Sequence, residues 1–301
     1  MEKYIDPISD VGFKLLFGRE SISEPVLIDL LNALLGHRDD SDRITSISYR
    51  NNERGADWKD GKGIRYDIHC ETAAGHRFIV EMQKASQPKF TDRATFYVAR
   101  GFTEQGYKGK DEDDIGWDYS LKPVIGVFIC NFHVKGLDPE PVIRASVLDE
   151  KSLKPIGIKS RYIFIQLPFF RKEEWECTDI EDQWIYNIKN MGIRQEVAFM
   201  NNSEIFKRLA QVANVATLTP AERWSYDADV KNARDTLNQI RGAYQDGEEK
   251  GRAEGRAEGR AEGRVETKLE IARSMLSDGI SPQKIAKFTG LSIEDIESLE
   301  H

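Results

Sequence analysis

Cysteine is scarce in this chain, with only three among 301 residues. Cys70, Cys130 and Cys177 stand far apart, which excludes a disulfide framework and the paired spacing of a zinc site. Long apolar runs are also missing, because no stretch approaches the roughly 20 consecutive apolar residues that a membrane helix needs. We therefore expect a protein of a reducing compartment that has no membrane partner.

An excess of basic residues is missing as well, since 51 Asp and Glu against 43 Lys and Arg give a formal net charge of −8. This balance argues against nucleic-acid affinity spread over the whole surface, but it leaves room for a local basic patch. The first ten residues, MEKYIDPISD, contain no apolar core segment. We therefore expect no signal peptide, and a cytoplasmic location.

Apolar periodicity indicates a chain of mixed helices and strands. Phe13, Leu16 and Phe17 predict a helix over 10–18, capped by Ser9 or Asp10. A second helix is predicted to start at the N-cap Ser23 and to end at Gly36. The remaining predictions are strands at 43–51, 65–71, 77–85, 123–132 and 161–170, a helix at 89–107, and mainly helix from Glu173 onward. This order predicts an α/β fold.

Composition changes along the chain predict four parts. We expect a main domain at 1–200, a helical extension at 201–245, a tether at 246–265 and a small helical tail at 266–301. The tether contains the repeat GRAEGRAEGRAEGR at 251–264. Each glycine costs a helix about 1 kcal/mol relative to alanine, so we expect a frayed, solvated helix there. A helix–helix contact through the small residues is the alternative.

Two carboxylates stand in the strands of a predicted hairpin, in the stretch IRYDIHCETAAGHRFIVEMQK. A three-residue loop ending at Gly75 pairs Glu71 with Arg77 and therefore places Asp67 opposite Glu81. The Cβ atoms of opposed residues lie about 4.5–5.5 Å apart, so the two like charges destabilise a bare sheet. A bound divalent cation is the simplest compensation.

The two faces of this hairpin differ in character. One face is predicted to carry Tyr66 together with Ile68, Cys70, Phe78, Val80 and Met82 toward the core, and the other carries Asp67, Glu81 and Gln83. An ordinary solvated outer face is the alternative to a metal site, and pattern alone leaves both open.

Several stretches of the chain resemble one family. The segments DVGFKLLFG, LLNALLG, VEMQK and FTDRATFYVAR are similar to the recombination-promoting nuclease (Rpn, putative transposase) branch of the PD-(D/E)XK nuclease superfamily. The resemblance covers roughly residues 4–265. It implies a PD-(D/E)XK restriction-endonuclease-like core, a mixed sheet flanked by helices, with a helical C-terminal extension.

The resemblance also implies roles for particular residues. Asp67, Glu81 and the backbone carbonyl of Met82 would bind Mg²⁺, for which Mn²⁺ is expected to substitute, and the activity would be DNA cleavage linked to recombination or mobile elements. Gln83 stands where the superfamily has lysine. An amide cannot act as a base but can orient the attacking water, which leaves a hydroxide on the metal or a substrate phosphate oxygen as candidate bases. Lys14 could supply the missing positive charge, with Asp10 beside it; a plain surface lysine and a cap are the alternative.

DNA is expected to lie along the helix at 89–107. Lys89, Arg93 and Arg100 fall on one helical stripe, which predicts a phosphate-binding strip; a solvated helix face with Phe96 in the core is the alternative. The tail at 266–301 looks similar to a helix-turn-helix. Its last helix carries four acidic residues and no Lys or Arg, which favours protein contact or homo-oligomerisation over DNA reading. The rival interpretations of the whole chain are a catalytically weak binding module for DNA or protein and an oligomeric scaffold.

Overall fold

The computed structural model describes residues 3–36, 43–54, 63–106 and 120–300. A six-stranded mixed sheet has the strand order β1-β4-β5-β6-β8-β7. Strands β5, β6 and β8 run parallel, and the other three pair in antiparallel fashion with their neighbours. The strands are β1 (Ile47–Tyr49), β4 (Ile68–Thr72), β5 (Arg77–Gln83), β6 (Val124–Cys130), β7 (Val142–Ser146) and β8 (Ser160–Gln166). A separate ladder pairs β2 (Glu53–Arg54) with β3 (Ile64–Arg65).

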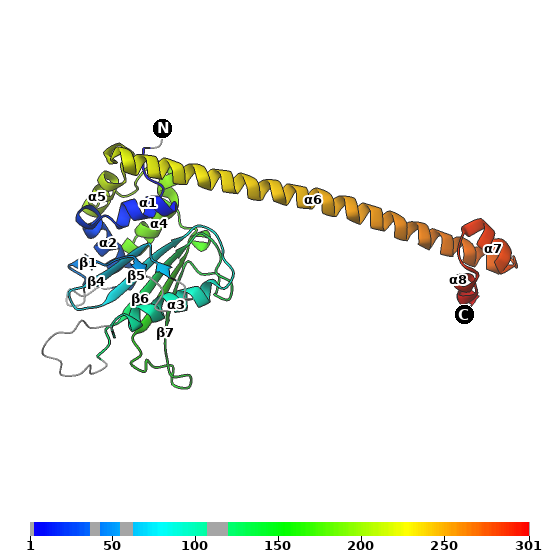
Figure 1. Ribbon diagram of the computed structural model, residues 1–301, viewed down its shortest axis with the longest axis horizontal. Coiled ribbons are helices and arrows are strands. Elements are labelled where there is room, and N and C mark those ends of the chain that lie inside the picture. Colours follow the sequence, from blue (N-terminus) through cyan, green and yellow to red (C-terminus); the bar gives the residue numbers. More distant parts are fainter. Residues whose placement is uncertain (1–2, 37–42, 55–62, 107–119, 301) are drawn as a thin grey trace. The chain divides into compact units, whose positions relative to one another are not determined.

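Helices cover both faces of the main sheet, which confirms the expected α/β class (Figure 1). One face packs against α1 (Asp10–Phe17), α2 (Glu20–Leu35), α4 (Ile180–Arg194) and α5 (Glu204–Ala213). The other face packs against α3 (Phe90–Thr103). The chain then continues through α6 (Pro220–Ser277), α7 (Pro282–Thr289) and α8 (Ile293–Glu297). No helix in the described ranges has the length and apolar character that a membrane crossing requires.

The larger core lies between the sheet and the four-helix layer. It contains Phe13 of α1, Leu27 of α2 and Trp184 of α4, packed against Val80 and Val127 of the sheet. The smaller core joins Ala94 and Val98 of α3 to the opposite face of β5 and β6. Both faces of β5 are therefore buried. The hairpin does not have the solvated outer face that was the alternative to a metal site.

The first helix begins as the sequence predicts, and the second does not. The Ser9 hydroxyl accepts a hydrogen bond from the Gly12 N–H and caps α1. Helix α2 starts at Glu20, so Ser23 lies within its first turns instead of capping it. Gly36 ends α2 in the left-handed conformation, at φ +66°, as expected of a C-cap glycine.

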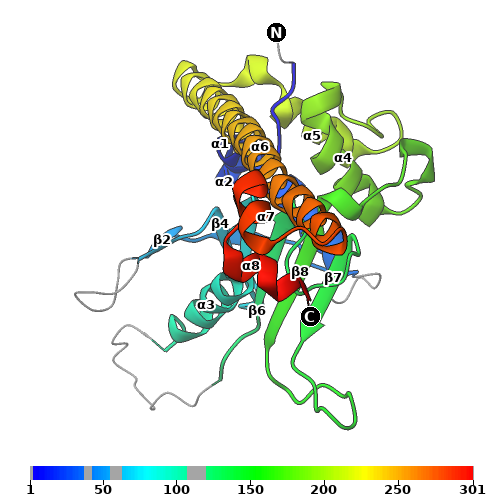
Figure 2. The same ribbon diagram turned by 90° about the vertical axis from the view of Figure 1, so that its right-hand side faces the viewer.

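Strand β7 was absent from the predicted elements. Its residues are half-buried or exposed because it is an edge strand, and such a strand lacks the continuous apolar run that marked β6 and β8. The loop between β7 and β8, residues 147–159, extends past the ends of the two strands in both views (Figures 1 and 2).

The glycine repeat is continuous helix, contrary to the expected fraying. It lies within the 58-residue helix α6, and all of its residues are exposed. The alanines, arginines and glutamates of the repeat propagate helix well, and helix on both sides removes the need to nucleate it. A Cβ atom placed on Gly251, Gly255, Gly259 or Gly263 would meet nothing within 4 Å, so within the described chain the small residues pack against no other element.

The chain divides into two compact units, residues 1–232 and 233–301. In the second unit, Ala272 at the end of α6, Ile285 of α7 and Ile296 of α8 form a small core. Gly290 ends α7 at φ +69°, and the Ser292 hydroxyl accepts the Asp295 N–H at 3.0 Å to cap α8. Two short helices joined by a turn agree with the helix-turn-helix that the tail resembles.

A chain that ends at Gln245 is expected to keep the fold of the first unit, which closes at Asn232. A chain that ends at Leu218 additionally loses the wholly buried Tyr226, and removal of a large buried aromatic costs about 3–5 kcal/mol. Urea unfolding of both chains measures the difference. Equal stability of the two truncated chains would contradict the packing described here.

Candidate active site

The hairpin that carries the two carboxylates has the register that the glycine turn predicts. Gly75 adopts φ +82°, and His69 pairs with Ile79 across β4 and β5. Asp67 lies one residue before β4, so the ladder brings it to Glu81 without pairing it. The tight turn and the period of two therefore suffice to bring Asp67 and Glu81 together.

The chain leaves the regular strand at Tyr66 and Asp67, and this bend overturns one prediction. Tyr66 packs with α3, its ring 5.4 Å from that of Tyr97 at a nearly perpendicular angle, and does not join the core face of Ile68. Asn52 holds the bend: its amide donates to the Asp67 carbonyl at 3.0 Å and accepts the His69 N–H at 3.1 Å. Alternation of side chains fails here because the strand is interrupted.

The two carboxylates interlock through the backbone. The Asp67 N–H donates to Glu81 Oε1 at 3.0 Å, and the Met82 N–H donates to Asp67 Oδ2 at 2.9 Å. Each carboxylate thus accepts a backbone N–H from the segment that carries the other carboxylate. Only 7% of Asp67 and 2% of Glu81 is exposed, so both charges lie in a setting where an unpaired carboxylate is costly.

Two cationic side chains reach this buried pair. Lys14 Nζ of α1 lies 3.0 Å from Asp67 Oδ1 and 3.1 Å from Asp10 Oδ2. Arg93 of α3 lies 3.3 Å from Glu81 Oε2. The structure therefore places Lys14 and Asp10 beside the carboxylates, as the sequence analysis suggested.

Burial dominates the electrostatics of the pair. Burial, and then the negative charge of Asp67, raise the pKa of Glu81, Arg93 lowers it, and the net result is a pKa of about 8. Burial also raises the pKa of Asp67 against the lowering effect of Lys14. Burial alone would lower the pKa of Lys14, but the two aspartates outweigh it and the pKa is raised. The site therefore has more negative charge than its two cations balance, which favours either a proton or a further cation.

Gln83 lies at the end of β5 and is buried beside Glu81. Its Nε2 donates to Glu81 Oε2 at 3.3 Å, from the same face of the strand. The amide is thus in reach of the carboxylate pair, as the Glu-x-Gln spacing predicts.

The predicted DNA strip is not a continuous exposed stripe. Arg93 contacts Glu81 and stacks over the Tyr97 ring, 5.1 Å from its centroid. Arg100 has a side chain only 16% exposed, near Glu104 at 3.9 Å. Of the three basic residues, Lys89 alone is exposed, and Phe96 is 49% exposed where the alternative had placed it in the core. Helical spacing identified the stripe but could not show that two of its residues turn inward.

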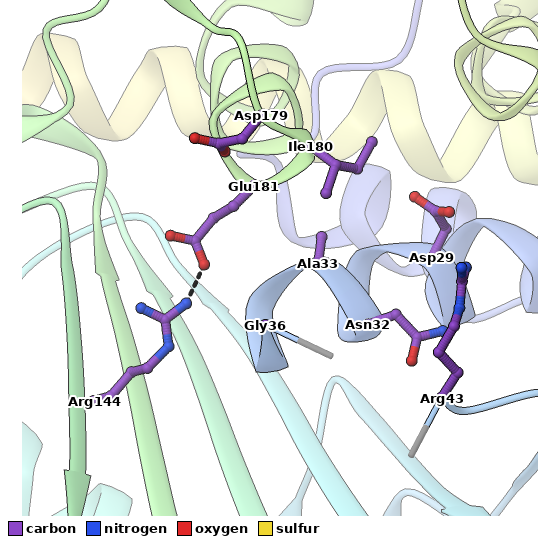
Figure 3. Close-up of a pocket in the computed structure, with 9 residues that line it drawn as sticks. All are labelled: Asp29, Asn32, Ala33, Gly36, Arg43, Arg144, Asp179, Ile180 and Glu181. Atoms are coloured by element: carbon purple, nitrogen blue, oxygen red, sulfur yellow. Dashed lines mark hydrogen bonds and ion pairs between the residues drawn. The ribbon is translucent and has the colours of Figure 1, made fainter. Parts of the chain in front are cut away.

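A cavity of about 660 Å³ lies elsewhere, between α2 and α4 (Figure 3). Arg144 pairs there with Glu181, and Asp29 accepts the Trp184 indole N–H at 2.7 Å. None of the predicted site residues lines this cavity. Within the described residues, no group of three or more His, Cys, Asp and Glu side chains is arranged to hold a metal ion. A cation at Asp67 and Glu81 would therefore depend on oxygen ligands beyond these two carboxylates.

Comparison with known families agrees with this geometry. Residues 7–243 match the family described as PD-(D/E)XK nuclease family transposase. Residues 265–301 match the C-terminal helix-turn-helix domain of the Rpn/YhgA-like nuclease family. This match agrees with the helix-turn-helix that the sequence of the tail resembles. The searches of curated proteins and of solved structures found no match. The mixed sheet, its flanking helices and the extent of the first match together show that this chain belongs to the PD-(D/E)XK nuclease family transposases, in the Rpn/YhgA-like branch.

Proposed function

We propose that the chain is a metal-dependent DNA endonuclease that hydrolyses phosphodiester bonds, with a role in recombination or mobile-element biology suggested by its family. The observation that carries the proposal is the pair of interlocked, buried carboxylates at Asp67 and Glu81. A folded chain gains no stability from two acidic groups held together in this way, so a function is the simpler reason for them.

The residues present fit a divalent cation. Asp67, Glu81 and the backbone carbonyl of Met82 offer the oxygen ligands that Mg²⁺ prefers, and Mn²⁺ would take the same ligands. Within the described residues, the ion pairs of Asp10, Asp67 and Glu81 are with Lys14 and Arg93, so with all groups ionised three negative charges meet two positive ones. A cation bound there polarises the scissile phosphate and lowers the pKa of a bound water.

The other side chains have distinct tasks in this proposal. Lys14 supplies the positive charge that Gln83 cannot, and its ammonium group stabilises negative charge that develops on the phosphate. Arg93 neutralises Glu81 on the α3 side. Gln83 orients the attacking water through its amide.

Cleavage of supercoiled plasmid tests the proposal. The wild-type protein with Mg²⁺ or Mn²⁺ is expected to nick or linearise the plasmid, and excess EDTA is expected to stop it. A homogeneous preparation that leaves DNA intact with either ion would contradict the proposed activity.

Replacing Gln83 by alanine is expected to slow cleavage about 10²–10³-fold, the usual cost of losing one well-placed hydrogen bond to a reacting group. Metal binding should persist because the two carboxylates remain. Calorimetric titration with Mn²⁺ separates the two effects. Loss of Mn²⁺ binding in this variant would make Gln83 a ligand and contradict its proposed role.

A second candidate function concerns the C-terminal unit. The helix-turn-helix match favours DNA binding by this unit, whereas acidic residues such as Glu294 and Asp295 in the first turn of α8 favour contact with protein, including a second copy of the chain. The chain ending at Gln245 distinguishes these possibilities. Weaker DNA binding with a shallower salt dependence supports DNA contact by the tail, and a changed mass in light scattering with unchanged DNA binding supports oligomerisation.

A further inference from the structure

The helix that brings Lys14 to the site is too short to hold its position by itself. Helix α1 spans eight residues, Asp10–Phe17, whereas isolated helices shorter than about 12–15 residues are marginal in water. Lys14 lies in its second turn, with its ammonium group 3.0 Å from Asp67. The contacts that hold α1 in place therefore also hold the Lys14 ammonium group at the carboxylate pair.

One face of α6 contacts the chain at both ends of α1. Glu222, Tyr226 and Asp229 recur at i, i+4 and i+7, which places them on the same side of α6. We call these three residues the α6 stripe. All three belong to the first compact unit.

The α6 stripe contacts both ends of α1. Glu222 lies 3.5 Å from Arg19, just beyond the C-terminus of α1. At the other end, Asp229 Oδ2 accepts the Ser9 hydroxyl at 2.6 Å and the Val11 N–H at 3.4 Å. Tyr226, which lies between these two residues in α6 and is wholly buried, accepts the N–H of Asp6, upstream of α1, through its hydroxyl at 2.8 Å.

Asp229 completes the N-terminal cap of α1. The Ser9 hydroxyl donates to Asp229 and accepts from the Gly12 N–H at 2.9 Å, so the carboxylate fixes the direction in which the hydroxyl points. A carboxylate at this end also complements the helix dipole. The fit is close, because a Cβ atom on Gly12 would lie 2.2 Å from the Asp6 carbonyl oxygen. The start of α1 therefore has little room to shift.

We propose that Asp229 is a positioning residue for the nuclease site, which acts through Ser9 and helix α1 to hold Lys14 at Asp67. This inference rests on the role proposed above for Lys14. It makes the first turns of α6 part of the working enzyme, although no residue of the α6 stripe contacts the carboxylate pair. The same helix continues to Ser277, so the segment that leads to the C-terminal unit begins at the element that positions Lys14.

The test compares D229A with a matched control, D227A. Asp227 is an exposed aspartate two positions earlier in α6, paired with Arg223 at 2.8 Å on the same helix. D229A is expected to lower kcat for plasmid cleavage about 10- to 100-fold with KM little changed, because a small misplacement of a reacting group has an effect of that size. D227A is expected to keep both constants, and D229N, which retains an acceptor for Ser9, is expected to recover most of the rate.

A double variant separates positioning from simple loss of stability. If Asp229 acts through Lys14, K14A and K14A/D229A should cleave at the same reduced rate. Additive losses, or a D229A variant at the wild-type rate while K14A is slow, would overturn the positioning role and leave the proposed nuclease intact. Wild-type cleavage by K14A would instead remove the role proposed for Lys14. If D229A does not fold, S9A breaks the same link from the α1 side and is expected to give the same change in kcat without a change in KM.

Discussion

Asp67→Asn and Glu81→Gln are each expected to reduce metal-dependent plasmid cleavage by at least about 10³-fold. Losing one electrostatic contact to a transition state costs about 10²–10³, and either change also removes a carboxylate ligand of the cation. The amide variants keep an oxygen that can accept the Met82 or Asp67 N–H, so the fold should persist. Cleavage under Mg²⁺ with purified variants, checked by circular dichroism, measures the effect.

Alanine at either position is a poorer choice for this experiment. It leaves a buried backbone N–H without its acceptor, which costs about 1–3 kcal/mol and confuses loss of structure with loss of ligand. Glu71→Gln serves as the control, because Glu71 is a carboxylate of the same hairpin that pairs with Arg77 at 3.0 Å. A D67N variant that cleaves at the rate of this control would contradict the assignment of the site.

The free energy of unfolding of the metal-free protein is expected to fall by about 2–3 kcal/mol between pH 6 and pH 9. The pKa of Glu81 is about 8 in the folded chain, against 4.5 for an ordinary glutamate, so the folded state binds the proton more tightly. A carboxyl group whose pKa is raised by folding contributes stability that is complete below its unfolded pKa. That contribution is lost as the pH rises through the folded value.

Urea unfolding in EDTA at pH 6, 7.5 and 9 measures this dependence. E81Q removes the titrating group, so the difference between wild type and E81Q isolates the contribution of Glu81 to the pH dependence. Added Mg²⁺ should restore wild-type stability at pH 9, because a ligand of the folded state stabilises it by mass action. The rate of cleavage should also rise as the pH approaches 8, because Glu81 must lose its proton to bind the cation. A wild-type curve that parallels that of E81Q would show that Glu81 is already ionised at pH 6.

The sequence predicts the centre of the site well and its surroundings poorly. Gly75 and the hairpin register bring Asp67 to Glu81, because a tight turn fixes which residues of the two strands lie opposite each other. Asn52 and Asp229 leave no such signal. Each acts through hydrogen bonds to residues 15 or more positions away, which only the folded chain brings into contact.

Helical spacing predicts which residues share one face of a helix, but not how deeply each side chain is buried. It placed Lys89, Arg93 and Arg100 on one stripe, yet it could not indicate that Arg93 would turn to a buried glutamate and that Arg100 would lie close to Glu104. At the repeat 251–264, helix propensity was the misleading signal. Four glycines predicted fraying, but residues of high propensity and helix on both sides outweigh them.

The most direct test of the central claim is a crystal soaked in Mn²⁺ and measured for anomalous scattering. We expect one strong peak in contact with carboxylate oxygens of both Asp67 and Glu81, and no such peak in a D67N crystal treated in the same way. A wild-type crystal at saturating Mn²⁺ with no peak there, and with Lys14 still bound to Asp67, would contradict the claim that this pair is a metal site.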